Sequence, residues 1–317
     1  MELLKNQGTP VNFTAANFNT VPFDPKKLAW RRFLRKCAEL RHWISEYGWE
    51  TTIYLSLAKA LGYNKNSQPF VQLVKLMPPT KIIDSVHPLQ RSPLIFWILL
   101  AWQAGLLQRP LKNSIHFAPS LPYKLINHLK RQFAHIFTLP GQNLIQWNFA
   151  RLRPYNNPYN RLAGFSQILH HYQNRSLFKI LLESHMKRAP LGHLIGDVKK
   201  TLNLPLSMDL KIFFKQLLGT GGLSDYSIGQ KRCQLFHLNL LLPLFYIWAG
   251  VNHNPGFARY LEDLYYQYPA VDHNSRLQQL MGNLKTPDLK YAFGHQALLE
   301  YYQLNFIRQQ FSFQKRH

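Results

Sequence analysis

The chain has 317 residues, 46% of them hydrophobic, and carries 38 Lys and Arg residues against 15 Asp and Glu residues, a formal net charge of +23. This length suits one large domain or two ordinary ones with a proper core, and the composition excludes a largely disordered chain. The charge favours a polyanionic partner, nucleic acid or an anionic membrane surface. A basic protein that only avoids self-association is the alternative.

Carboxylates are missing from one long stretch of the chain. Asp84 is the only acidic residue between Glu50 and Glu183, and the segment Ser85–Leu182 has none. That segment, called the acid-free segment below, holds eleven basic residues: Arg91, Arg109, Lys112, Lys124, Lys130, Arg131, Arg151, Arg153, Arg161, Arg175 and Lys179. Because no carboxylate of the segment can neutralise these cations, they must be solvated, contact backbone carbonyls or face an anion.

The N-terminal part predicts a lead-in followed by a basic helix. Residues 1–23 are rich in Asn and Thr and show no periodicity, so we predict a flexible lead-in there. A helix is predicted to begin after Asp24, which can cap it, with Pro25 in the first turn. Its apolar residues recur at helical spacing, and its other face is basic, as expected of a solvated outer face.

Two more helices are predicted before the first proline pair. The segment WETTIYLSLAKALG (49–62) predicts a helix that ends at Gly62. The segment NSQPFVQLVKLM (66–77) predicts the next, with Ser67 as its cap and Pro78 and Pro79 after its end.

Two apolar runs predict buried core helices. SPLIFWILLAWQAGLLQ (92–108) has Ser92 as a cap and Pro93 in the first turn, and it is shorter than the roughly 20 residues that span a bilayer. LFHLNLLLPLFYIWAGV (235–251) contains polar residues and a proline. We therefore expect no integral membrane span. Two distant cysteines and the absence of a secretory signal fit a reducing, cytoplasmic location.

The stretch RLRPYNNPYNRLAGFSQIL (151–169) predicts a structural corner with cations attached. Pro154 disfavours helix before it, and Asn157 and Pro158 are typical of a helix start. An apolar stripe follows. The corner leaves three arginines unexplained. Together with a basic pair on the preceding predicted helix they are the candidate nucleic-acid-binding residues: Arg151, Arg153, Arg161, Lys130 and Arg131. The alternative is that the arginines bind helix carbonyls.

The C-terminal third predicts further helices after a glycine-rich linker, GTGGLSD (219–225). We take that linker as the boundary between a basic helical domain (24–218) and a C-terminal helical subdomain (225–317) packed on it. Alternating β-branched runs with hairpin turns are almost absent. The sequence therefore predicts an all-α fold, an irregular multi-helix bundle of about ten to twelve helices.

The sequence contains no recognisable catalytic constellation. No zinc-protease, nucleophile-elbow or phosphate-loop motif occurs. His170 and His171 are adjacent and point apart on a helix, and His128 and His135, two helical turns apart, have no acidic or cysteine partner nearby. Core or surface positions explain the histidines better than a metal site does. We expect no cofactor, no metal and no catalytic residue in this chain.

Several phrases resemble a bacterial family of unknown function, DUF2851. They are YGWETTIYLSLAKALGYNKNSQPFVQLVKLMP (47–78), WQAGLL (102–107), the Arg-Leu-Arg-Pro corner (151–169), IGQKRCQLFHLNLLLPLFYIWAG (228–250) and GHQALLEYY (294–302). The resemblance covers roughly Leu28 to Tyr302. It implies an uncharacterised, mostly helical module similar to the C-terminal part of the family.

The resemblance also implies what this chain lacks. Family members are typically longer and begin with a β-rich portion that is similar to a metal-dependent nuclease fold, with Gly-Pro-Asp-Phe and Glu-Ile-His phrases that are absent here. We therefore expect a non-catalytic nucleic-acid-binding module. The alternatives are a scaffold for an acidic partner or for a separate nuclease-like chain, and an enzyme whose site uses a carboxylate such as Glu50 or Asp84.

Overall fold

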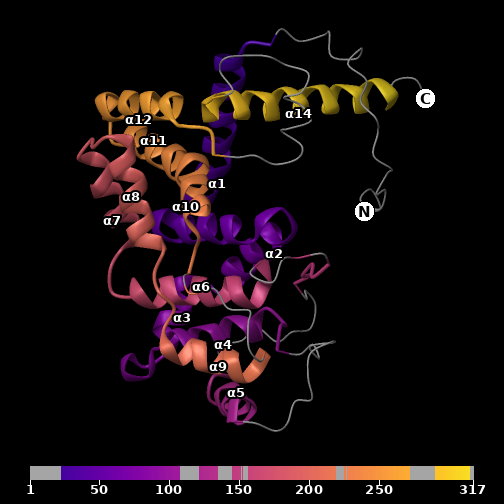
Figure 1. Cartoon of the computed structure of the whole chain (residues 1–317), viewed down its shortest axis with the longest axis vertical. Helices are drawn as coiled ribbons and strands as arrows, with labels where there is room; N and C mark the ends of the chain where they lie inside the picture. The colour runs from indigo at the N-terminus through magenta and orange to yellow at the C-terminus, as the bar shows by residue number, and fades with distance from the viewer. Residues whose placement is uncertain are drawn as a thin grey trace. The chain divides into compact units, whose positions relative to one another are not determined.

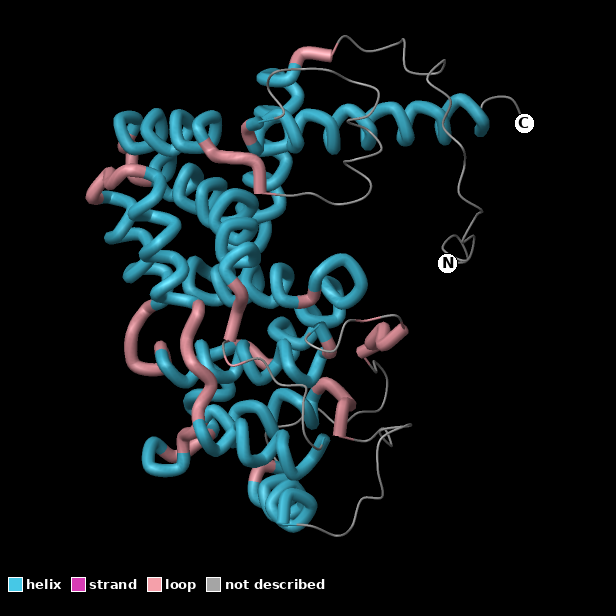
Figure 2. The backbone as a smooth tube through the Cα atoms, in the orientation of Figure 1, coloured by secondary structure: helices cyan, strands magenta, loops and turns pink. Residues whose placement is uncertain are grey.

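The structure, a computed structural model, describes residues 23–107, 121–134, 145–150, 152, 156–218, 225, 227–271 and 290–314. Over these residues the chain forms helices joined by loops, and an isolated β-bridge pairs Pro269 with Tyr291 without forming a strand (Figure 2). The predicted all-α class is confirmed. The predicted lead-in and glycine-rich linker lie largely outside the described residues.

The helices follow the chain in the order of Figure 1. They are α1 (Pro25–Leu61), α2 (Tyr63–Leu76), α3 (Pro79–Ser85), the 3₁₀ turn η2 (Pro88–Gln90), α4 (Pro93–Gln103), α5 (Leu121–Gln132), α6 (Pro158–His171), α7 (Leu177–Met186), α8 (Leu191–Leu202), α9 (Met208–Leu218), α10 (Gln230–Phe236), the π-helical turn η5 (His237–Leu241), α11 (Leu242–Val251), α12 (Pro255–Gln267) and α14 (Ala292–Gln314).

Contacts group the chain into two compact units. Unit 1 comprises the described residues up to Arg35 and those from Asp263 onward, and unit 2 comprises Lys36–Glu262. The division predicted from the sequence, at 219–225, falls on a linker of which only Asp225 is described, so it stays a prediction.

Local capping signals explain several helix ends. The backbone N–H of Lys27 donates to the Asp24 carboxylate at 3.1 Å, and the N–H of Ile95 donates to the Ser92 hydroxyl at 3.2 Å at the start of α4. Helix α1 consists of two helical stretches that meet in a kink at Gly48, just before the second predicted helix (49–62), and the backbone there is non-helical, with φ of 74° and ψ of 173°. A positive φ suits glycine because it lacks a Cβ.

The predicted start of the third helix is wrong. Helix α2 begins at Tyr63 directly after Gly62, and Ser67 lies inside it, where its hydroxyl donates to the Lys59 carbonyl. The helical path breaks between α1 and α2, because Tyr63 takes a left-handed backbone with φ of 52°. Pro69 is tolerated within the helix, six residues after its start.

The core of unit 2 is built around α4. Its residues from Phe96 to Ala101 are buried, and it packs against α2, α5, α6 and α9. The indole N–H of Trp97 donates to the Tyr159 carbonyl at 3.1 Å, and the Tyr159 hydroxyl donates to the Leu106 carbonyl at 3.0 Å. These bonds satisfy the polar ends of two buried aromatic side chains, which would otherwise destabilise the core.

One continuous helical segment among the described residues, Gln230–Val251, is long and apolar enough to cross a bilayer. It comprises α10, η5 and α11, and 61% of its most apolar window is buried inside the protein. Burial of this kind is what the core helix of a globular protein shows, as the sequence predicts for residues 235–251.

Unit 1 is held by aromatic and ionic contacts. The Tyr265 hydroxyl donates to the Ala29 carbonyl at 3.0 Å. Glu300 of α14 is buried, with only 3% of its side chain exposed, and it accepts a hydrogen bond from Arg35 at 2.7 Å. Arg31 and Arg32 lie within 4 Å of the same carboxylate. Here a single carboxylate neutralises part of the basic face of α1.

Candidate nucleic-acid interface

The described part of the corner before α6 is structural, as predicted, whereas Pro154 lies outside the described residues. Asn157 caps the helix by accepting a hydrogen bond from the Tyr159 N–H at 3.0 Å, and Pro158 occupies the first helical position. The side chains of Leu162, Phe165 and Leu169 are buried. Asn157 and Pro158 therefore have structural roles at the start of α6, and only the arginines are left as candidates for a binding site.

Arg161 lies in a cluster around Tyr63. Arg161 is only 9% exposed to solvent. Its Nη2 donates to the Tyr63 hydroxyl and to the Asn156 side-chain carbonyl, both at 2.6 Å, and its guanidinium carbon lies 4.7 Å from the centre of the Tyr63 ring. A second guanidinium, that of Arg232 from α10, lies over the same ring at 3.4 Å. We call Tyr63, Asn156, Arg161 and Arg232 the Tyr63 cluster.

The Tyr63 cluster carries two cations and no carboxylate. No described acidic residue forms an ion pair with Arg161 or Arg232, and neither buried Nε has a hydrogen-bond partner among the described residues. Burial lowers the pKa of Arg161, and the charge of Arg232 lowers it further, while Tyr63 opposes both effects. The guanidinium stays charged at neutral pH, so an anion would find unused donors and uncompensated charge here.

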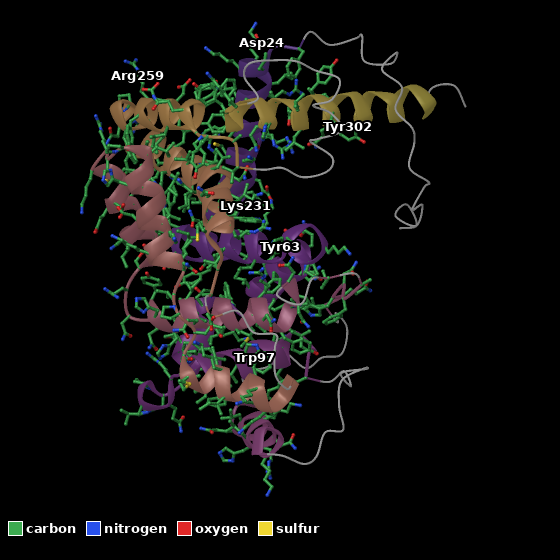
Figure 3. All side chains as sticks on the ribbon, in the orientation of Figure 1. Asp24, Tyr63, Trp97, Lys231, Arg259 and Tyr302 are labelled. Carbon is green, nitrogen blue, oxygen red and sulfur yellow. The ribbon has the colours of Figure 1, made fainter. Side chains whose placement is uncertain are left out.

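A close helix contact supports the position of the two arginines. Gly164, one turn after Arg161, has no Cβ, and a Cβ at that position would lie 2.1 Å from the Ser227 carbonyl oxygen. Ser227 precedes α10 by three residues and is fixed through its N–H, which donates to the Leu204 carbonyl at 2.8 Å. The glycine thus lets α6 approach the segment that carries Arg232. Figure 3 labels Tyr63 and Lys231, the chain neighbour of Arg232.

Helix α5 presents a second basic feature, within the acid-free segment. Its residues Ile126 and Leu129 are buried, whereas Lys124, His128 and Arg131 are exposed at helical spacing. We call these three the α5 stripe. The Nε of Arg131 donates to the Asn127 carbonyl, one turn earlier, at 3.4 Å.

Of the two candidates on α5, Lys130 differs from Arg131. Its ammonium lies 5.8 Å from the centre of the Trp102 ring, and partial burial lowers its pKa. Lys130 thus packs its charge against an aromatic face, while Arg131 is exposed. The structure brings Arg131 together with Lys124 and His128, and it places Arg161 in the Tyr63 cluster.

Arg151 and Arg153 lie outside the described residues. The segment before them is anchored to α2, because the Asn66 side chain pairs with the backbone of Asn148 through two hydrogen bonds of 2.8 and 2.9 Å. Lys65 donates to the Ala150 carbonyl at 2.6 Å. The prediction for Arg151 and Arg153 stays a prediction.

Two carboxylates of unit 2, those of Glu50 and Asp197, have structural partners. Glu50 accepts hydrogen bonds from the Ser176 hydroxyl and from the N–H groups of Leu177 and Phe178, at the start of α7. Asp197 accepts from the Ser184 hydroxyl at 2.6 Å. The Glu50 charge therefore stabilises the N-terminus of a helix, where a negative charge is favourable.

Two buried histidines of unit 2 face each other. Nε2 of His185 lies 2.9 Å from Nε2 of His237, and Nδ1 of His185 lies 2.7 Å from the Leu181 carbonyl. Because a carbonyl only accepts, Nδ1 carries the proton, and Nε2 accepts the N–H of His237. Burial lowers the pKa of His185 to about 4 and lowers that of His237 well below its ordinary value. Both rings are neutral at pH 7.

Nucleophile and metal chemistry find little support among the described residues. Cys37 and Cys233 are buried and unpaired, and burial raises the pKa of each thiol to about 12, so neither is a thiolate at pH 7. Within the described ranges no group of three or more His, Cys, Asp or Glu side chains is placed to hold a metal ion.

Sequence reasoning missed Tyr63 and Arg232. It also missed that Lys124, His128 and Arg131 form one stripe on α5. Residues 63, 161 and 232 are brought together only by tertiary packing, and no local pattern links them. The α5 stripe did have a signal, because Lys124, His128 and Arg131 are four and three residues apart and therefore share one helix face.

Comparison with known proteins gives one match. The model of a family described as a protein of unknown function, DUF2851, matches residues 24–274. Neither the search of curated proteins nor that of solved structures gave a match. The family match covers most of the chain and agrees with the resemblance carried by the Trp-Glu, Gln-Ala-Gly-Leu-Leu and Arg-Leu-Arg-Pro phrases. This chain therefore belongs to the DUF2851 family.

Proposed function

We propose that this chain is a non-catalytic module that binds nucleic acid through exposed basic residues of the acid-free segment. The observation that carries the proposal is the α5 stripe, where Lys124 and Arg131 are exposed on one face and form no ion pair with a described carboxylate. By contrast, two other described lysines of unit 2 do form ion pairs: Lys59 with Glu39, and Lys211 with Asp225.

The geometry of the α5 stripe suits a phosphate backbone. Lys124 and Arg131 are seven residues apart, which is about 10.5 Å along a helix axis. Phosphates of one duplex strand follow one another at about 3.4 Å along the duplex axis, so the two side chains can contact different phosphates. Contacts of this kind carry no base information, so the expected binding is largely independent of sequence.

A scaffold for an acidic protein, or for a separate nuclease-like chain, is the competing function. Positive charge alone serves either partner, and the experiment must separate them. Purification at low salt followed by mass spectrometry does so: co-purified nucleic acid supports the proposal, whereas one stoichiometric acidic protein without nucleic acid favours the scaffold.

Direct binding with paired variants tests the interface. The double variant Lys124→Gln/Arg131→Gln removes two exposed charges, and fluorescence anisotropy with labelled duplex and single-stranded DNA and RNA measures its affinity. We expect weaker binding to every probe and a salt slope that is shallower by roughly 1.8 for duplex DNA, about 0.9 for each lost phosphate contact. Lys211→Gln is the matched control, because that lysine already pairs with Asp225. Equal loss in both variants would contradict a role for α5.

A further inference from the structure

We propose that the Tyr63 cluster binds a phosphate monoester, the terminal phosphate of a nucleic-acid strand. The identity of the strand rests on the proposed function, whereas the binding of a phosphate group rests on the cluster itself. The site would make the module prefer strand ends over internal positions, which the exposed cations of α5 cannot do.

Unused hydrogen-bond donors are the first argument. The Nε of Arg232 is shielded from solvent and has no hydrogen-bond partner among the described residues, although it belongs to a guanidinium that offers five N–H donors. Arg161 is nine-tenths buried, and its Nε also lacks a described partner. Buried donors without acceptors are rare in proteins, and a bound ion or an ordered water is one explanation for those that occur.

Preorganisation is the second argument. Arg232 is stacked over the Tyr63 ring at 3.4 Å, and Arg161 is fixed by its bonds to the Tyr63 hydroxyl and to Asn156. A guanidinium that is already oriented loses little conformational entropy when it takes up a phosphate, and its planar fork matches two phosphate oxygens. A surface lysine has neither property.

Charge balance selects a monoester over a diester. Two guanidinium charges meet at one ring, they repel each other, and no described carboxylate pairs with either. A phosphate monoester carries about −1.5 to −2 at pH 7, close to the charge that the pair lacks. An internal phosphodiester carries a single negative charge and would leave the site half-compensated.

Oligonucleotides that differ only at one end test this inference. A single-stranded oligonucleotide with a 5′-phosphate, one with a 3′-phosphate and one with hydroxyls at both ends are titrated against the full chain. We expect at least about tenfold tighter binding of one phosphorylated probe than of the hydroxyl probe, the gain typical of one charge-assisted, bidentate contact. Competition by inorganic phosphate should reduce the difference between the probes.

Variants assign the effect to the Tyr63 cluster. Arg232→Gln should abolish the preference for a phosphorylated end and leave the binding of the hydroxyl probe unchanged. Lys231→Gln is the matched control, because it removes an exposed charge from the adjacent position of α10 and should keep the preference. Arg232→Lys retains the charge without the fork and should reduce the preference while the fold is kept, as thermal melting would verify.

The outcomes separate the two proposals. Equal, salt-sensitive binding of all three probes by the wild-type chain would overturn the end-recognition inference and leave the proposed function in place. Absence of binding to any probe would refute the proposed function. The cluster would then be tested with inorganic phosphate alone, in a thermal unfolding assay. If phosphate does not raise the melting temperature of the wild-type chain more than that of Arg232→Gln, the inference of a phosphate site is overturned. Arg232-dependent binding of a phosphoserine peptide without binding of the oligonucleotides would overturn the nucleic-acid assignment.

Discussion

The buried pair of His185 and His237 makes the stability of unit 2 depend on pH. In the folded chain the pKa of His185 is lowered to about 4, mainly by burial, while the Leu181 carbonyl and Asp197 act in the opposite direction. In the unfolded chain the pKa of a histidine is about 6.5. Below that value the unfolded state binds more protons than the folded state does, so stability falls as the pH is lowered.

The size of the effect follows from the two pKa values. For His185 alone, linkage gives a loss of about 2 kcal/mol between pH 7 and pH 5, and roughly 3 kcal/mol by pH 4. His237 adds to the loss in the same direction, because its pKa is also lowered. A physical cause is visible in the geometry: a proton on Nε2 of His185 would face the N–H of His237, which lies 2.9 Å away.

Urea unfolding followed by tryptophan fluorescence at pH 5, 6 and 7 measures this dependence. The wild-type chain should lose about 2 kcal/mol or more from pH 7 to pH 5. His185→Gln should lose about 2 kcal/mol less than the wild type, because only the contribution of His237 then remains. His193→Gln, at an exposed position of α8, should behave as the wild type. If His185→Gln and the wild type lose equal stability over this window, then burial does not hold the two rings neutral and the reasoning is refuted.

Three further predictions concern packing and buried charge. Gly164→Ala should cost about 1–3 kcal/mol in the free energy of unfolding, because the new Cβ would meet the Ser227 carbonyl at 2.1 Å. Gly196→Ala in α8 is the control, because nothing lies within 4 Å of its Cβ position. In the same urea assay it should be neutral or stabilising by up to about 1 kcal/mol. Glu50→Ala should lower stability by about 1–2 kcal/mol through the loss of the α7 cap while oligonucleotide affinity is kept; loss of affinity without loss of stability would instead assign Glu50 to a site. Glu300→Gln should lower the melting temperature and cost about 1–3 kcal/mol in the free energy of unfolding. This cost is smaller than the loss of a fully buried ion pair, because the arginines that face Glu300 are partly exposed. An unchanged melting temperature would show that these ion pairs contribute nothing.

The features that sequence reasoning predicted correctly are local. Asp24, Ser92 and Asn157 each cap a helix as expected, because the capping side chain and the N–H that it accepts from lie within three residues of each other. The near absence of strand signals, which are also read from neighbouring residues, indicated the all-α class. Ser67 shows the limit of such signals, because the left-handed backbone at Tyr63 starts α2 one turn earlier.

The features that sequence reasoning missed depend on distant residues. Arg161 was singled out because no carboxylate is near it in sequence, and the structure adds that none of the described carboxylates pairs with it. Its partner Arg232 lies in α10, and the two residues are related through the Tyr63 ring and the close approach of Gly164 to Ser227. Lys130 and Arg131 were predicted as a basic pair, and their different surroundings on α5 depend on the packing of Lys130 against Trp102, which is distant in sequence.

The salt dependence of nucleic-acid affinity tests the proposed function most directly. Binding of the wild-type chain to duplex DNA is measured between about 50 and 200 mM salt, and the logarithm of the association constant is plotted against the logarithm of the salt concentration. Two phosphate contacts from Lys124 and Arg131 alone give a slope of about −1.8, and further exposed cations make it steeper. A slope of that size or steeper is the predicted result. A slope near zero, or no measurable binding at the lowest salt concentration, would contradict the proposal that this chain binds nucleic acid.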